Sequence, residues 1–139
     1  MGARGLIDTG AILAFLDRDD RWHGRCVAAL STLSLPLATS AAVLAELFHL
    51  LRNHPQQKAA VWTFVRSAVV TVPAIEDADL PALEALMRKY ADRPMDFADA
   101  TLVRLAERES LSTIFTIDHD DFETYRIDGR RRFRIVPDR

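Results

Sequence analysis

Short runs of β-branched and apolar residues alternate with longer segments of helical periodicity along this chain. The short runs predict strands at residues 5–7, 35–39, 69–72 and 113–117. Helical spacing predicts one or two helices between successive strands, at residues 9–16, 22–33, 40–55, 56–67, 77–90 and 94–108. Strands separated by helices pair in parallel, with helices on both faces of the sheet. The alternation therefore predicts a three-layer α/β/α sandwich with a mainly parallel central sheet. The Asp128-Gly129 pair predicts the turn of a C-terminal hairpin over residues 125–136.

Length and composition limit the class of protein. The chain has 139 residues, of which 49% are hydrophobic and 27% charged, and this suits one globular domain over residues 1–139 rather than a disordered chain. Cys26 is the sole cysteine, so no intramolecular disulfide can form and the reducing cytoplasm is the expected compartment. No apolar run approaches the roughly 20 residues of a membrane span, and we expect neither a membrane association nor a signal peptide.

Two aspartates directly follow predicted strands. Asp8 comes after the strand at 5–7, and Asp118 comes after the strand at 113–117. The carboxyl ends of parallel strands meet at one edge of a sheet, and ligands bind in the crevice at that edge. We therefore expect both carboxylates to face the same crevice.

Three further acidic residues stand in or beside apolar helix faces. Glu46 lies in a predicted helix with apolar residues three positions before it and four after it, so we expect its carboxylate to be half-buried. Burial of an ionised carboxylate is costly unless a cation compensates it, and no basic residue lies on the same helix face. Asp96 and Asp99 are three residues apart at the start of a predicted helix, so both point toward one side of its first turn.

Each acidic residue also has a simpler interpretation. Asp96 suits a helix N-cap, and Asp118 suits the cap of a turn before Phe122. Asp120 and Asp121 suit solvated turn residues. The joint interpretation as one site is favoured because every candidate maps to the same edge of the predicted sheet.

A cluster of carboxylates without a base indicates a divalent cation. Such a cluster repels itself unless hard cations neutralise it. Ligation by oxygen alone selects Mg²⁺, with Mn²⁺ as a substitute, over zinc, which favours His and Cys ligands. The four histidines show no paired ligand spacing, and His119, which lies beside Asp118, is expected in a loop.

The order of these acidic residues resembles that of a PIN domain, and the nearest subgroup is the VapC-like ribonuclease toxins of bacterial toxin–antitoxin pairs. The segments that carry the resemblance are 6–11, 45–47, 99–102 with Ala106, 115–118 and 121–122. The resemblance implies that four acidic residues are catalytic and hold the metal: Asp8, Glu46, Asp99 and Asp118. It places Asp8 and Asp99 nearest the ion. Supporting roles are expected for Asp96, Asp121, Thr9 and Thr116, of which the two threonines would orient a carboxylate or the attacking water.

The resemblance implies metal-assisted hydrolysis of RNA phosphodiester bonds by an endoribonuclease. It also implies an RNA substrate, a small antitoxin protein as partner, and a homodimer, for which the apolar residues at 47–51 and 61–65 are candidate contacts. Two alternatives stay open: a non-catalytic PIN-like module that binds protein or RNA, and a housekeeping PIN nuclease. The string Asp8-Thr9-Gly10 also occurs in aspartic proteases, but the helical periodicity excludes their all-β fold.

Basic residues on either side of the acidic positions are candidates for contacts with RNA phosphates. They form two groups, one before the helix at 94–108 and one on the predicted hairpin: Arg88, Lys89 and Arg93, and Arg130, Arg131 and Arg132 with Arg134. The alternative for the second group is protection of an edge strand against pairing. A formal net charge of −2 is compatible with RNA, because gathering six acidic residues in one site leaves 14 acidic against 18 basic residues elsewhere.

Overall fold

A five-stranded parallel sheet forms the centre of the molecule. The structure, a computed structural model, describes residues 2–139. The strand order across the sheet is β3 (Val70–Thr71), β2 (Leu37–Ala38), β1 (Gly5–Ile7), β4 (Thr113–Phe115) and β7 (Arg134–Val136). All four neighbouring pairs are parallel. The predicted α/β class with a parallel central sheet is confirmed.

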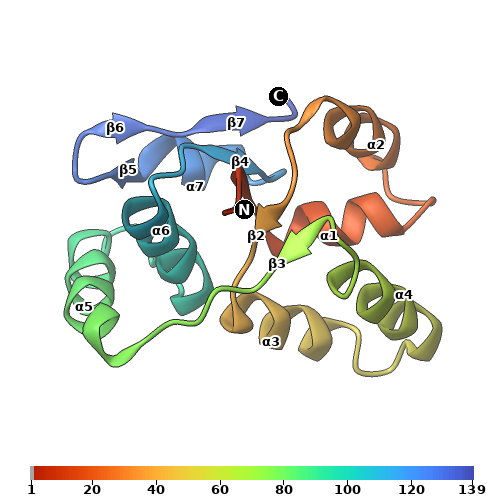
Figure 1. Cartoon of the computed structure of the whole chain (residues 1–139), viewed down its shortest axis with the longest axis horizontal. Helices are drawn as coiled ribbons and strands as arrows, with labels where there is room; N and C mark the ends of the chain where they lie inside the picture. The colour runs from red at the N-terminus through yellow and green to blue at the C-terminus, as the bar shows by residue number, and fades with distance from the viewer. Residues whose placement is uncertain (1) are drawn as a thin grey trace.

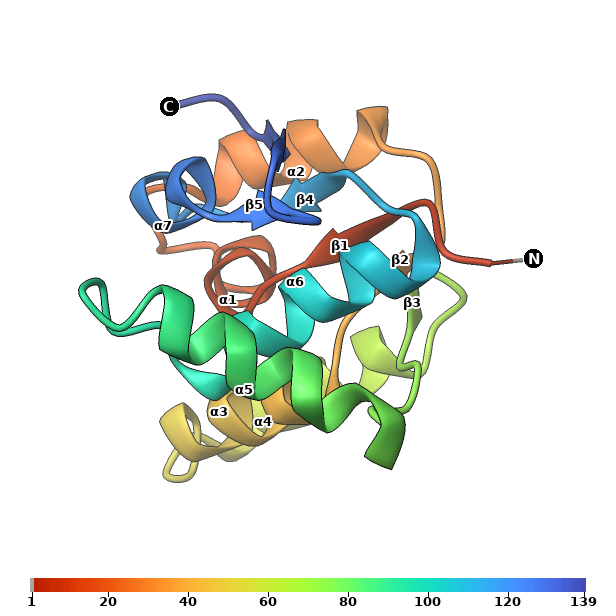
Figure 2. The same cartoon turned by 90° about the vertical axis from the view of Figure 1, so that its left-hand side faces the viewer.

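Helices cover both faces of this sheet. Their bounds are α1 (Thr9–Leu16), α2 (His23–Thr32), α3 (Ala41–Leu50), α4 (Pro55–Val65), α5 (Leu80–Lys89), α6 (Phe97–Glu109) and α7 (His119–Thr124), with a 3₁₀ turn η1 (Asp77–Asp79) before α5. Figure 1 shows the element order, and in Figure 2 the central strands lie between α2 and α7 on one side and α5 and α6 on the other. Within residues 2–139, no helix combines the length and apolar character needed to cross a membrane.

The predicted hairpin is correct at its turn and wrong in its second arm. β5 (Arg126–Ile127) pairs antiparallel with β6 (Arg131–Arg132) around Asp128 and Gly129, which both have positive φ. The apolar residues that follow do not extend this ribbon. They form β7, which pairs in parallel with β4, because Ile135 and Val136 pack against the core there while the buried Phe133 packs edge-on against Phe122. The exposed β6 arginines stay in the two-stranded ribbon.

The segment after β4 is helical, where a turn and a loop were expected. α7 has only six residues, too few to show helical periodicity in the sequence. The expectation of a loop position for His119 is wrong, because this buried residue is the first of α7. Its Nε2 lies 2.8 Å from the carbonyl oxygen of Pro137, and its ring packs against Trp22 at a centroid distance of 5.5 Å. The first contact joins the C-terminal segment to the start of α7, and the second joins the N-cap of α2 to it.

α6 is the most deeply buried helix, and this fixes the position of its first turn. Eight of its residues are buried, from Ala98 to Ala106. A buried acid ties it to the preceding elements: the Asp79 carboxylate accepts hydrogen bonds from Arg104 Nε at 2.8 Å and Arg108 Nη1 at 2.6 Å. These ion pairs join the carboxyl half of α6 to η1.

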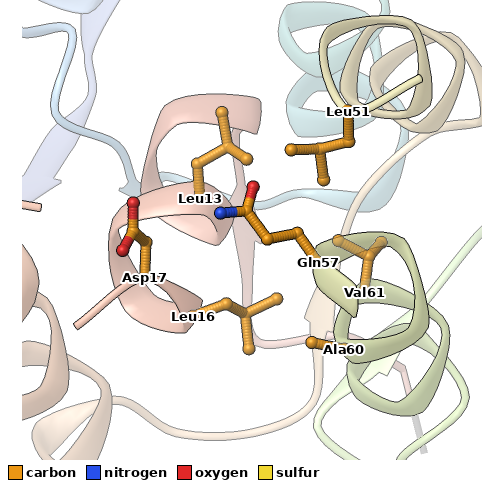
Figure 3. Close-up of a pocket in the computed structure, with 7 residues that line it drawn as sticks. All are labelled: Leu13, Leu16, Asp17, Leu51, Gln57, Ala60 and Val61. Atoms are coloured by element: carbon orange, nitrogen blue, oxygen red, sulfur yellow. The ribbon is translucent and has the colours of Figure 1, made fainter. Parts of the chain in front are cut away.

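A small cavity of about 40 Å³ lies between α1, the end of α3 and α4. Figure 3 shows the Gln57 side chain extending toward Leu13 in this space, with Leu16 and Leu51 beside it. The volume suffices for a water molecule. The cavity contains a single acidic side chain, Asp17, so it is a packing feature rather than a cation site.

Candidate metal centre

A pocket of about 400 Å³ opens at the carboxyl ends of β1 and β4, and we call it the acidic pocket. All six acidic residues that the sequence indicated line it: Asp8, Glu46, Asp96, Asp99, Asp118 and Asp121. No Lys, Arg or His is among the lining residues that the structure describes. The fold thus brings together carboxylates that lie up to 113 positions apart in the chain.

Asp8 is placed by the end of β1 and the start of α1. Its Oδ1 accepts a hydrogen bond from the Thr9 amide at 2.7 Å, which makes Asp8 the N-cap of α1. Its Oδ2 accepts a hydrogen bond from Thr116 Oγ1 at 3.0 Å. The same threonine hydroxyl accepts a hydrogen bond from the Asp118 amide at 3.0 Å. Thr116 therefore links the two acids that follow β1 and β4.

Asp99 lies in the first turn of α6 and is held from both sides. Its backbone amide donates to Asp96 Oδ1 at 2.8 Å, so Asp96 is the N-cap of α6 and also lines the pocket. Its carboxylate Oδ2 accepts a hydrogen bond from the hydroxyl of Tyr125 at 2.9 Å. The sequence did not single out Tyr125, because its contact with Asp99 spans 26 residues and the position was expected in a hairpin strand.

The acids of α7 divide between the pocket and the surface. Asp118 caps α7, with its Oδ1 accepting from the Asp121 amide at 3.3 Å, so it caps a helix rather than a turn. Asp121 lines the pocket and pairs with Arg93 Nη1 at 2.8 Å. Asp120 is exposed and pairs with Arg139 outside the pocket. The interpretation as a solvated residue thus suits Asp120 and not Asp121.

Glu46 reaches the pocket from α3, on the side opposite α7. Its side chain is half-buried, as expected from the apolar residues around it. None of the ion pairs found among residues 2–139 includes Glu46. It therefore adds a negative charge to the pocket without a cation of its own.

Burial and mutual repulsion raise the pKa values of the central acids. Burial raises the pKa of Asp8 to about 7 against the opposing hydrogen bonds from Thr9 and Thr116, and the charges of Glu46 and Asp118 add to the rise. Burial raises the pKa of Asp99 to about 8, with further contributions from the charges of Asp8 and Asp96. Partial desolvation raises the pKa of Asp118 to about 6, and the side-chain hydrogen bond with Asp121 and the charge of Asp121 add to the rise.

These shifts have a direct chemical meaning. Near neutral pH and without a cation, Asp8 and Asp99 each hold a proton for part of the time. A divalent cation in the pocket would offset the repulsion, displace these protons and stabilise the ionised carboxylates. The pocket is therefore electrostatically incomplete on its own.

The residues fit a hydrated Mg²⁺ ion. The pocket offers carboxylate oxygens and the hydroxyl of Thr9, which is buried and has no hydrogen-bond partner among the described residues. In residues 2–139, no group of three His, Cys, Asp or Glu side chains is already arranged to hold an ion directly. Mg²⁺ keeps several water ligands and is commonly held by one or two carboxylates, so the donor set suits it better than zinc.

Most of the basic residues expected at an RNA surface lie away from the pocket. Arg93 alone among them contacts a pocket residue, and Arg88 pairs with Glu84 on the surface of α5. The Lys89 ammonium lies beside Gly129, in the turn that precedes Arg130. The fold thus joins the end of α5 to the arginine-rich β5–β6 ribbon.

The whole chain resembles known PIN-domain proteins. Residues 5–128 match the PIN domain family. Ribonuclease VapC26 of Mycobacterium tuberculosis (strain ATCC 25618 / H37Rv) is 29% identical over 134 residues, which cover 95% of this chain and 99% of that protein. The crystal structure of M. tuberculosis VapC20, described as a sarcin-ricin loop cleaving toxin, is similar in fold, with a TM-score of 0.72 and 23% identity over 84% of this chain and 91% of that one.

The family match and the geometry agree on the same region. The matched residues include β1, α3, α6 and β4, which together place Asp8, Glu46, Asp99 and Asp118 around one pocket. The shared fold explains why acids from four separate segments meet at one sheet edge. The chain belongs to the PIN-domain family.

Proposed function

We propose that this protein is a metal-dependent endoribonuclease of the VapC type, and that it acts as the toxin of a toxin–antitoxin pair. The observation that carries the proposal is the pair of buried carboxylates, Asp8 and Asp99, which face a common pocket without a cationic partner. The similarity to a ribonuclease over nearly the whole length of both chains supports the activity. Six acids around one pocket suit phosphodiester hydrolysis better than a binding role alone.

In this mechanism the residues of the chain would bind the metal ion and orient the carboxylates around it. When bound, Mg²⁺ or Mn²⁺ lowers the pKa of a water ligand and stabilises negative charge on the phosphate and the leaving oxygen. Asp8 and Asp99 would hold the ion, while Glu46 and Asp118 would add the charge that retains it. Thr116 keeps Asp8 oriented through its 3.0 Å hydrogen bond, and Asp96 keeps the first turn of α6 in place.

The RNA backbone needs cations outside the acidic pocket, because the pocket itself repels phosphate. Arg93 stands at the rim, where it pairs with Asp121. Lys89 and the β5–β6 ribbon extend this positive surface, so we assign Arg88, Lys89, Arg93, Arg130, Arg131 and Arg132 to backbone contacts. Such contacts carry no sequence information and make binding weaken with salt.

An antitoxin and a second copy of the chain are the expected protein partners. The apolar surface predicted at residues 47–51 and 61–65 is smaller than expected, because Leu47, Leu51 and Val61 are buried. Leu50 and Trp62 remain about half exposed, and Leu50 also lines the acidic pocket. We propose that a partner contacts these two residues. Light scattering that gives the mass of one chain at working concentration would exclude the homodimer.

RNA cleavage by the purified protein tests the activity. The wild type, Asp8→Asn and the exposed control Glu84→Gln are incubated with a panel of structured RNAs at increasing Mg²⁺ or Mn²⁺. We expect metal-dependent internal cuts by the wild type and the control, and none by Asp8→Asn. Binding of RNA without cleavage at any metal concentration would instead indicate a non-catalytic PIN-like module. Broad cleavage of many RNAs would favour a housekeeping nuclease over a toxin.

A further inference from the structure

The two most deeply buried pocket acids each accept one hydrogen bond from a side-chain hydroxyl. Asp8 accepts from Thr116 at 3.0 Å, and Asp99 accepts from Tyr125 at 2.9 Å. Both donors belong to the segment 116–125, which begins at the end of β4 and includes all of α7. The same segment carries Asp118. One short stretch of chain therefore holds acids that come from two other elements, β1 and α6.

Tyr125 is fixed by its surroundings, so its hydroxyl has little freedom to choose another partner. The side chain is 1% exposed, and its ring packs edge-on against Tyr90 and Phe122 at centroid distances of 5.0 and 5.2 Å. The next residue is anchored as well, because the Arg126 amide donates to the Tyr90 hydroxyl at 2.9 Å.

We propose that Tyr125 is a positioning residue of the metal site, which fixes the Asp99 carboxylate by binding Oδ2 and leaves Oδ1 for the cation. The inference rests on the proposed function and extends it to a residue outside the acidic cluster. Asp99 Oδ1 accepts no hydrogen bond from the described residues and belongs to a pocket-lining side chain. Hydrogen bonds to metal-binding carboxylates orient the ligand, and their loss commonly lowers metal affinity about 10–100-fold.

Mn²⁺ binding to Tyr125→Phe and Tyr90→Phe separates positioning from packing. Both substitutions remove one hydroxyl from the same aromatic cluster and keep the ring. Tyr90 serves as the matched control because its hydroxyl contacts the Arg126 amide and no pocket acid. Free and bound Mn²⁺ are measured by electron paramagnetic resonance on the full chain, and thermal unfolding of the metal-free proteins gives the effect on packing.

We expect Tyr125→Phe to bind Mn²⁺ about 10-fold or more weakly than the wild type. Tyr90→Phe should bind Mn²⁺ as tightly as the wild type does, even if its melting temperature falls as far as that of Tyr125→Phe. Equal Mn²⁺ affinity in Tyr125→Phe and the wild type would overturn the positioning role while leaving the proposed activity intact. Equal losses in both variants would assign the effect to the aromatic cluster. A wild type that binds no Mn²⁺ would instead count against the proposed function itself.

Discussion

Two buried acidic regions of this molecule have opposite electrostatics. Asp79 is 2% exposed, and Asp8 and Asp99 are 7% and 8% exposed. The Asp79 carboxylate is bound by Arg104 and Arg108 and by the Glu76 amide at 2.9 Å. The Glu76 hydrogen bond, followed by that of Arg104, holds the pKa of Asp79 below its ordinary value. Burial and neighbouring carboxylates raise the pKa values of Asp8 and Asp99.

The difference separates an acid that serves the fold from acids that we propose bind a cation. Asp79 has its cations within the chain, so its ion pairs join η1 to α6 without any further component. Asp8 and Asp99 accept hydrogen bonds from hydroxyl and amide groups, but neither forms an ion pair with a basic side chain within residues 2–139. Buried carboxylates left in this state destabilise the fold, and such groups cluster at functional sites. The missing positive charge is the observation that most strongly supports the proposed cation site.

The largest expected effect comes from removing a charge from the acidic pocket. Asp99→Asn should lower metal-dependent RNA cleavage by about 10³-fold or more, since several kcal/mol of transition-state stabilisation depend on the ion. Its metal-free form should be as stable as the wild type at pH 8, or more stable, because an unpaired buried charge is lost. Cleavage rates and thermal unfolding of the same preparation measure both. A variant that cleaves at the wild-type rate would remove Asp99 from the site.

The matching substitution at Asp79 should lower the stability of the fold and leave RNA cleavage nearly unchanged, the opposite of the outcome expected at Asp99. Asp79→Asn leaves Arg104 and Arg108 without their shared partner and should lower the free energy of unfolding by about 2–3 kcal/mol, since both arginines are partly exposed. Its cleavage rate per folded molecule should stay near that of the wild type. Denaturant unfolding with Glu84→Gln as the exposed control measures the difference. A neutral effect at Asp79 would contradict the division between fold and site.

The two regions should also respond oppositely to pH. The folded protein holds protons on Asp8 and Asp99 up to pH values of about 7 and 8, whereas the unfolded chain has released them above about pH 4. Stability of the metal-free protein therefore falls as pH rises from about 4 to 8 on account of these groups. The lowered pKa of Asp79 contributes stability above its unfolded value, and this contribution is lost on acidification.

Unfolding at a series of pH values checks the sign. The decline between pH 5 and 8 should be shallower in Asp8→Asn than in the wild type, because one of the titrating groups is absent. Mg²⁺ should raise the melting temperature more at pH 8 than at pH 6, where it competes with protons. An identical pH slope in the wild type and Asp8→Asn would show that Asp8 does not titrate in this range.

The smallest expected effect concerns Arg93 at the rim of the pocket. Its pair with Asp121 is partly exposed, so Arg93→Ala should leave the free energy of unfolding nearly unchanged. RNA binding should weaken for every sequence tested, and the slope of log K against log salt should fall by about one. RNA affinity measured at several salt concentrations checks this, and an unchanged slope would exclude a phosphate contact.

Much of the fold and site could be predicted because the acidic residues stand beside, or within, the apolar strands and helices that place them. Asp8 directly follows the short apolar strand β1, and Asp118 lies three residues after β4, which ends two residues earlier than predicted. Glu46 interrupts an apolar helix face. The remaining features depend on distant contacts. Phe133 packs on Phe122 and turns the chain into β7, and α7 is too short for a periodic signal. The Tyr125 contact with Asp99 exists only once the segment between α7 and β5 has packed against α6.

Isothermal titration of the metal-free protein with Mg²⁺ and Mn²⁺ at pH 7 tests the cation site most directly. Comparison of two buffers with different ionisation heats gives the number of protons released on binding. We expect saturable binding with net proton release, because Asp8 and Asp99 are partly protonated before the ion enters. Both the binding and the release should be lost in the double variant Asp8→Asn, Asp99→Asn. No binding at millimolar metal, or equal binding by the double variant, would contradict a cation site in the acidic pocket.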